Sequence, residues 1–157
     1  MTIHSKELLY KGDKEVDFVR PDLTSNTTWG GNNFGVKANV NTTRAYRAVD
    51  GNISTYWETN NYTTPIYRFY NPKPIKITSL QIACASTVYV PASVTIKGNN
   101  NDYSTYEDLG GTKTLLSGTY TIDLSTNTKY YKYYALELTL KSASVRIAEL
   151  VIKAKEK

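Results

Sequence analysis

The sequence predicts an all-β protein, an antiparallel β-sandwich of the jelly-roll type with about eight strands. The chain of 157 residues has the size of one domain, which is enough for a single hydrophobic core. Strand-sized apolar runs separated by turn residues follow one another along the chain, and none shows a helical period. The 14 Tyr residues also favour sheet, because Tyr combines apolar area with a hydroxyl group.

Alternation of apolar and polar residues locates the strands. It is clearest over 130–140, where Tyr134, Leu136 and Leu138 share one face and Tyr133 and Glu137 share the other. A period of two is typical of a half-buried antiparallel strand. The other expected strands cover 36–40, 65–70, 75–84, 92–98, 118–124 and 145–153, with "EVDFV" (15–19) as an additional edge strand.

The last expected strand changes parity in its middle. The apolar residues before Ala148 and those after Glu149 cannot face the same core in a regular strand. If both sets are buried, an extra residue is absorbed at Ala148–Glu149, and we expect a β-bulge there. The apolar residues concerned are Val145, Ile147, Leu150 and Ile152.

The chain divides into a polar lead-in, residues 1–20, and one domain, residues 21–157, without an internal repeat or linker. The lead-in has no apolar core, so we do not interpret it as a signal peptide, and no later segment is apolar enough to span or insert into a membrane. The formal net charge is +5, but Lys and Arg are spread along the whole chain. We therefore expect no nucleic-acid partner.

The residue inventory argues against an enzyme. The one histidine is His4, in the lead-in, and no Ser, Cys or carboxylate has a visible catalytic partner. The one cysteine, Cys84, lies in the apolar run "SLQIACAS", so we expect a buried structural thiol. We therefore expect no catalytic residues.

Six segments of the sequence form an ordered set: "LTSNTT", "AYRAVDGNISTYW", "PIYRFYNPKPIKITSLQI", "VPASVTIKGNNNDYSTYEDL", "YYKYYALELTL" and "VRIAELVI". Taken in this order, they resemble the discoidin or coagulation factor 5/8 type C domain. The similarity covers about 21–153 and is greatest to the bacterial carbohydrate-binding modules of family 32. It implies a galactose-binding-like fold that binds glycan, or in animal relatives phospholipid or protein, through loops at one end.

The resemblance also implies a structural calcium ion bound by the turn "AYRAVDGNISTYW" and by the last strand. Hard cations prefer carboxylate and carbonyl oxygens, and Asp50 and Thr55 supply oxygens around the sharp reversal that Gly51 permits. The alternative is that Asp50 and Thr55 only close the turn through local hydrogen bonds. The positions that match the family's calcium site are Arg47, Asp50, Asn52, Thr55, Ala148 and Glu149. Trp57 is expected to pack in the core beneath this turn.

Three loops are expected to gather at the ligand-binding end, because sugars are recognised by aromatic rings and planar polar groups. Members that bind galactose carry an Arg in the third loop and an aromatic residue near the final turn (141–144). This sequence has neither, which leaves the sugar open. The candidates are Trp29, Asn32, Asn33 and Phe34 in the first loop, Glu58, Asn60 and Tyr62 in the second, and Thr87 and Tyr89 in the third.

We therefore expect a non-catalytic lectin-like module that binds a glycan or cell-surface polysaccharide, in an adhesin, a glycoside hydrolase or a phage particle. Its expected location is extracellular, at a cell surface or on a virion. The alternative is a structural or protein-binding module of a larger assembly, such as a virion decoration or tail attachment domain with other subunits as partners. Stable assembly without glycan would favour that alternative.

Overall fold

The computed structural model describes residues 14–102, 105–114, 118–141 and 144–157. Within these residues the regular secondary structure is antiparallel sheet, as the sequence predicts, apart from one short 3₁₀ helix. No described helix is both long and apolar enough to cross a membrane. The elements are β1 (Val16–Phe18), β2 (Gly35–Ala38), η1 (Thr42–Ala48), β3 (Trp57–Glu58), β4 (Ile66–Cys84), β5 (Pro91–Asn99), β6 (Glu107–Thr114), β7 (Thr119–Asp123), β8 (Tyr131–Leu140) and β9 (Arg146–Glu156).

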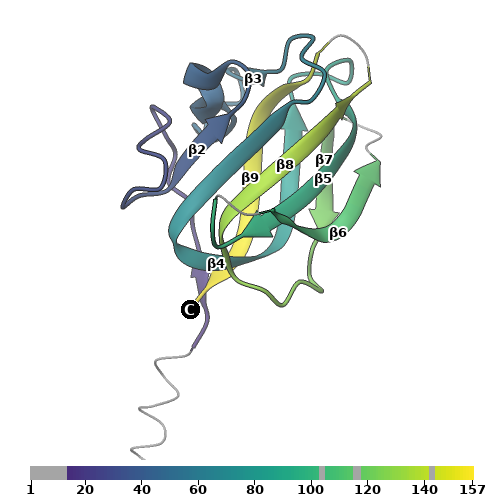
Figure 1. The fold of residues 1–157 in the computed structure, drawn as a ribbon. Helices are drawn as coiled ribbons and strands as arrows, with labels where there is room; N and C mark the ends of the chain where they lie inside the picture. Colours follow the sequence, from purple (N-terminus) through teal and green to yellow (C-terminus); the bar gives the residue numbers. More distant parts are fainter. Residues whose placement is uncertain (1–13, 103–104, 115–117, 142–143) are drawn as a thin grey trace, which may run out of the picture.

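The strands form two packed layers that share β4 (Figure 1). The first layer, called the front layer here, has β2 and β8 on the two sides of the first part of β4, followed by β5 and β6. The second, the back layer, has β9 and β7 on the two sides of the later part of β4, with β1 and β3 on β9.

The long strand β4 passes from one layer to the other. Residues 66–70 pair with β2 and β8, whereas the part from Ile75 onward pairs mainly with β9 and β7. The register shifts between Tyr70 and Ile75, where Pro72 and Pro74 lack the N–H groups that a regular ladder needs. The two strands expected at 65–70 and 75–84 are therefore one bent strand.

The core lies between the layers and is lined by alternate residues of each strand. In β8 the expected faces are confirmed, because Tyr134, Leu136 and Leu138 are buried while Tyr133 and Glu137 are only partly buried. Trp57 is fully buried, as expected, and its indole N–H donates to the Val40 carbonyl at 2.9 Å.

The bulge predicted in the last strand is present. Ala83 pairs with Glu149 and Cys84 pairs with Ile147, so Ala148 has no partner on β4. The apolar residues on both sides of the bulge, Ile147 and Leu150 among them, are buried together. The extra residue therefore lets both parities of β9 face the core.

Candidate functional site

The second and third predicted loops meet at the start of β9. The backbone N–H of Thr59 donates to the Val145 carbonyl at 3.0 Å, and the Arg146 N–H donates to the Tyr89 carbonyl at 3.1 Å. The N–H of Ala85 in turn donates to the Arg146 carbonyl at 2.9 Å. Backbone hydrogen bonds thus bring these loops and the β9 start together at one end of the sandwich (Figure 1).

Arg146 is the centre of this end. Its Nε donates to Glu58 Oε1 at 2.9 Å, and the Ser144 hydroxyl donates to the same oxygen at 3.1 Å. The guanidinium lies 3.9 Å from the ring centroid of Tyr89 and 4.9 Å from that of Tyr56. The hydrogen bond that Arg146 donates to the Glu58 carboxylate raises the pKa of Arg146, which stays protonated. We call Tyr56, Glu58, Tyr89, Ser144 and Arg146 the loop-end cluster.

The loop-end cluster presents the groups that sugar recognition uses. The guanidinium supplies donors in a fixed plane, the Glu58 carboxylate supplies acceptors beside it, and aromatic rings hold the guanidinium in place. The Glu58 and Arg146 side chains are one-quarter exposed, so solvent reaches both. Tyr62 adds an aromatic ring that is 44% exposed in the same loop as Glu58.

The first predicted loop lies apart from the loop-end cluster. Its end is fixed by the pair Gly35–Tyr70, whereas the second loop runs into Ile66 at the start of β4. Trp29 contacts the rings of Tyr70 and Tyr133 at centroid distances of 5.9 and 5.6 Å. The expected gathering of three loops is therefore found for the second and third only.

Phe34 is a correction to the candidate ligand residues. Its side chain is only 4% exposed and packs against Phe69 and Phe18, each with a centroid distance of 6.2 Å. Phe34 has the parity of the core-facing residues of β2, which explains its burial. The other candidates of the first loop, Asn32 and Asn33, are exposed, as are Asn60 and Thr87 in the two other loops.

The turn that the sequence singles out is closed by polar contacts of Asp50. Asp50 Oδ1 accepts the Asn52 backbone N–H at 2.9 Å, and Oδ2 accepts the Thr55 hydroxyl. That hydroxyl also lies 3.0 Å from the Asn52 carbonyl oxygen. Gly51 has a φ of 73°, in the left-handed region that permits the reversal. Three oxygen atoms from Asp50, Asn52 and Thr55 thus converge at the turn.

Glu149 stands beside the bulge with one carboxylate oxygen paired and the other alone. Arg20 contacts Oε1, whereas Oε2 is buried without a hydrogen-bond partner. Arg20 also donates to the Val49 carbonyl at 2.9 Å and to the Leu150 carbonyl at 3.1 Å, so it ties the turn to β9. A buried carboxylate oxygen without a partner is costly.

Local hydrogen bonds close the turn, and the buried Oε2 of Glu149 is the oxygen that they leave without a partner. The turn offers hydroxyl, carboxylate and carbonyl oxygens, and the unpartnered Glu149 oxygen supplies a second carboxylate. Oxygen donors of this mixture suit a hard divalent ion. Among the described residues, no three His, Cys, Asp or Glu side chains gather, so a cation held here would need carbonyl and hydroxyl oxygens as well.

Three members of the loop-end cluster, Tyr56, Ser144 and Arg146, are absent from the candidate ligand residues. Arg146 belongs to the "VRIAEL" strand, where the sequence pattern marks apolar neighbours as core and gives no sign that the arginine faces the loops. The one feature of the sequence that could have pointed to Arg146 was the absence of an arginine from the third loop, which left that position to be filled from another element. In the structure Arg146 reaches the Tyr89 ring of that loop from β9.

Cys84 packs against the core, as the sequence predicts, but it is only partly buried. It forms no disulfide, and burial raises the pKa of its thiol to about 11. The thiol therefore stays protonated near neutral pH and is a poor nucleophile.

Solved structures similar to this chain share its fold. An F5/8 type C domain from Bacteroides fragilis superposes with a TM-score of 0.66 at 16% identity, covering 79% of this chain and 91% of that one. A family 32 carbohydrate-binding module from Clostridium perfringens gives 0.61 at 19% identity, covering 79% and 94%. A chitosan-binding module from a Paenibacillus chitosanase/glucanase gives 0.63 at 16% identity, covering 80% and 96%.

These likenesses confirm that the chain has the fold of F5/8 type C domains and family 32 modules, a galactose-binding-like jelly roll. No protein-family model matches the sequence, and no curated protein matches it either. At these identities the similarity shows the fold alone, and function must be argued from the residues of this chain.

Proposed function

We propose that this protein is a non-catalytic carbohydrate-binding module that binds glycan at the loop-end cluster. The observation that carries the proposal is Arg146, held between the Tyr89 ring and the Glu58 carboxylate at a solvent-accessible end. Two adjacent hydroxyls of a sugar can bond one to the guanidinium and one to the carboxylate. Two of the similar structures support this proposal, because one is named as a family 32 module and the other as a chitosan-binding module.

Binding of a glycan array by the intact protein, followed by titration calorimetry with the best neutral oligosaccharide, tests the proposal. The variant Arg146→Met removes the donors and should weaken binding about tenfold or more, since hydrogen bonds to charged groups contribute about 1.5–3 kcal/mol. Lys153→Met, an exposed change on β9, is the matched control and should bind like the wild type. Unchanged affinity of Arg146→Met would refute the assignment of the site.

We further infer a structural calcium site held by the turn and the bulge. Asp50, Thr55 and Glu149 would supply side-chain oxygens, and Arg47, Asn52 and Ala148 would supply backbone carbonyls. When bound, a divalent ion would supply positive charge that compensates the partly buried carboxylates of Asp50 and Glu149. The unpartnered, buried oxygen of Glu149 supports this inference. The site would stabilise the scaffold, since it fastens the 50–55 turn to β9 and does not belong to the loop-end cluster.

Thermal melting after EDTA treatment, with calcium added back, tests the calcium site. Saturating calcium at about 100 times its Kd adds about 2.7 kcal/mol, which corresponds to a rise in Tm of about 5–10 °C. Glu149→Gln should lose most of this rise, whereas Glu137→Gln on the front layer should keep it. Sodium replaces calcium in a parallel sample to separate the two ions. An identical Tm with and without calcium would refute the inference.

The proposed module acts on glycans outside the cell, at a cell surface or on an extracellular polysaccharide. Small exposed clusters of this kind bind weakly one at a time, so its effect would depend on several copies or on a linked enzyme.

A further inference from the structure

The outer face of the front layer, away from the loop-end cluster, carries a row of cationic side chains. The residues directly opposite one another form one row across four strands, because the register pairs Lys37 with Arg68, Arg68 with Ala135, and Ala135 with Lys97. Paired residues of a ladder point to the same side of a sheet. The row therefore places three cations along one line, interrupted only by a small residue.

Two hollows lie on this row, one on each side of Arg68. The first, of about 130 Å³, is lined by Lys37, Ala38, Asn39, Ile66 and Arg68, and none of these residues is acidic. The second, of about 220 Å³, is lined by Ile66, Arg68, Lys97, Asp102, Thr105, Tyr106, Ala135 and Glu137. Ile66 and Arg68 line both, so the two hollows adjoin, and we call them together the sheet-face groove. Ala135 leaves room because its side chain is short.

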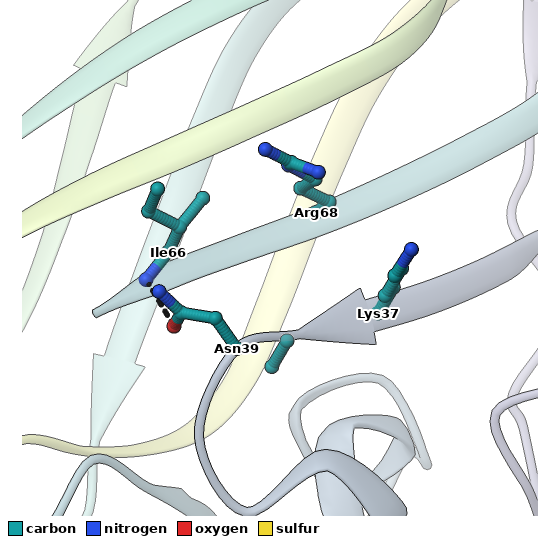
Figure 2. A pocket seen from close by; sticks show the side chains of 5 residues that line it. Lys37, Asn39, Ile66 and Arg68 are labelled. Atoms are coloured by element: carbon teal, nitrogen blue, oxygen red, sulfur yellow. Dashed lines mark hydrogen bonds between the residues drawn. The ribbon is translucent and has the colours of Figure 1, made fainter. Parts of the chain in front are cut away.

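Lys37 and Arg68 are the cations with spare binding capacity. Figure 2 shows them on neighbouring strands beside Asn39 and Ile66, with the Asn39 amide bonded to the Ile66 N–H. Within the described residues Lys37 forms no ion pair, and its ammonium lies 5.7 Å from the Trp29 ring centroid. In the part of the chain that the structure describes, Arg68 has one ion pair, at the long distance of 4.0 Å from Asp102, and its Nε is buried without a hydrogen-bond partner.

The nearby carboxylates do not compete strongly for these cations. Glu137 pairs with Lys97 at 2.9 Å. Asp102 accepts the Trp29 indole N–H at 2.9 Å and the Tyr106 hydroxyl at 2.5 Å. Burial acts to raise the pKa of Asp102, but these two hydrogen bonds and the charges of Arg68 and Lys37 outweigh it and lower the pKa. The negative charges are thus held in the second hollow, and the first hollow is left positive.

We propose that the sheet-face groove binds an acidic saccharide. The carboxylate or sulfate of one sugar residue would lie in the first hollow between Lys37 and Arg68. The hydroxyls of that residue or the next would bond in the second hollow, where Lys97, Asp102 and Glu137 provide both donors and acceptors. The Tyr106 ring, 5.3 Å from the Arg68 guanidinium carbon, gives an aromatic wall. The choice of a saccharide rests on the proposed glycan-binding function.

Titration calorimetry of the intact protein with three probes tests this site: an oligogalacturonate, a sulfated oligosaccharide and a neutral oligogalactose. Lys37→Met and Arg68→Met should each weaken binding of an acidic probe about tenfold, and the double variant should abolish it. Affinity for that probe should also fall as salt rises to about 0.5 M, because exposed charges are screened. Tighter binding of the oligogalacturonate identifies the preferred anion as carboxylate, and tighter binding of the sulfated oligosaccharide identifies it as sulfate. Lys153→Met is again the control and should change nothing.

The outcomes separate the two proposals. Arg146→Met should weaken the neutral probe and leave the acidic probe bound through Lys37 and Arg68. If neutral glycans bind but acidic ones bind no better, or bind equally well to the double variant, the groove is refuted and the loop-end proposal stands. If no glycan of either kind binds the wild type, both are refuted. Lys37→Glu, an exposed charge reversal, covers the case in which Arg68→Met fails to fold.

Discussion

At the scale of single residues, Arg20 links the turn before Gly51 to the last strand through several contacts of one side chain. It reaches the Val49 carbonyl of the turn, the Leu150 carbonyl and the Glu149 carboxylate of β9. Its side chain is only 10% exposed and that of Glu149 only 15%. The turn and the last strand are therefore held together by the Arg20 guanidinium without any metal ion.

We expect Arg20→Met to lower the free energy of unfolding by about 3 kcal/mol, because it leaves the Glu149 carboxylate buried without its cation. The loss should appear as a fall in Tm of about 6–12 °C. Calcium should restore more stability to this variant than it adds to the wild type. Melting curves with EDTA and with calcium measure both effects. Arg44→Met, at an exposed position, is the control; an equal calcium response in wild type and variant would separate Arg20 from the proposed metal site.

Gly51 is fixed by backbone geometry. Its φ of 73° is in the left-handed region, and an added Cβ would lie 2.5 Å from the Asp22 carboxylate. Gly51→Ala should therefore cost about 1–2 kcal/mol in backbone strain and lower the Tm by about 2–8 °C. Ser54→Ala in the same turn should be nearly neutral, since the bond at Ser54 uses its backbone N–H. A Tm equal to the wild type would show that the turn relaxes.

At the scale of elements, period-two patterns predicted the strands that bury one face. The β8 faces and the bulge in β9 follow directly from where apolar residues stand. β6 pairs with β5, but the sequence did not predict it. Its segment "EDLGGTKT" holds two glycines and a single apolar residue, so apolar and polar residues do not alternate along it. The 3₁₀ helix η1 was missed because seven residues are too few to show a helical period.

The candidate site was less predictable because it depends on register between distant strands. The row from Lys37 to Lys97 exists only through pairings across β2, β4, β8 and β5. Likewise, Arg146 reaches the Tyr89 ring because β9 begins beside the third loop. The separation of Trp29 from the other loops follows from the pairing of Gly35 with Tyr70, which no local pattern reveals.

The bulge in β9 can be tested by changing the length of the strand. Deleting Ala148 should shift the residues before it by one position and turn Ile147 out of the core, because successive side chains point to opposite faces. We expect loss of the cooperative thermal transition measured by circular dichroism. Ala148→Gly keeps the length of the strand and should cost only about 1 kcal/mol. A cooperative transition in the deletion variant would show that β9 tolerates a regular register.

At the scale of the whole molecule, weak sites call for several copies. A tetramer built by linking the C-termini should bind a glycan-coated surface about 10²–10⁴ times more tightly than the single chain. Surface plasmon resonance of both forms on the same surface measures the gain. A tetramer of the double variant Lys37→Met, Arg68→Met should keep the gain on neutral glycan and lose it on acidic glycan. Equal affinity of monomer and tetramer would mean that copies cannot engage together.

The pairing of β1 with the end of β9 places both ends of the described chain together, with Val16 opposite Glu156. β9 starts at the loop-end cluster and runs for 11 residues, a length of roughly 33 Å at about 3.3 Å per residue. Figure 1 shows the C-terminus at the end of the sandwich far from the loops. A linker attached at either end would therefore leave the loop-end cluster facing away from the attachment point. It would also leave the sheet-face groove accessible along the side of the sandwich.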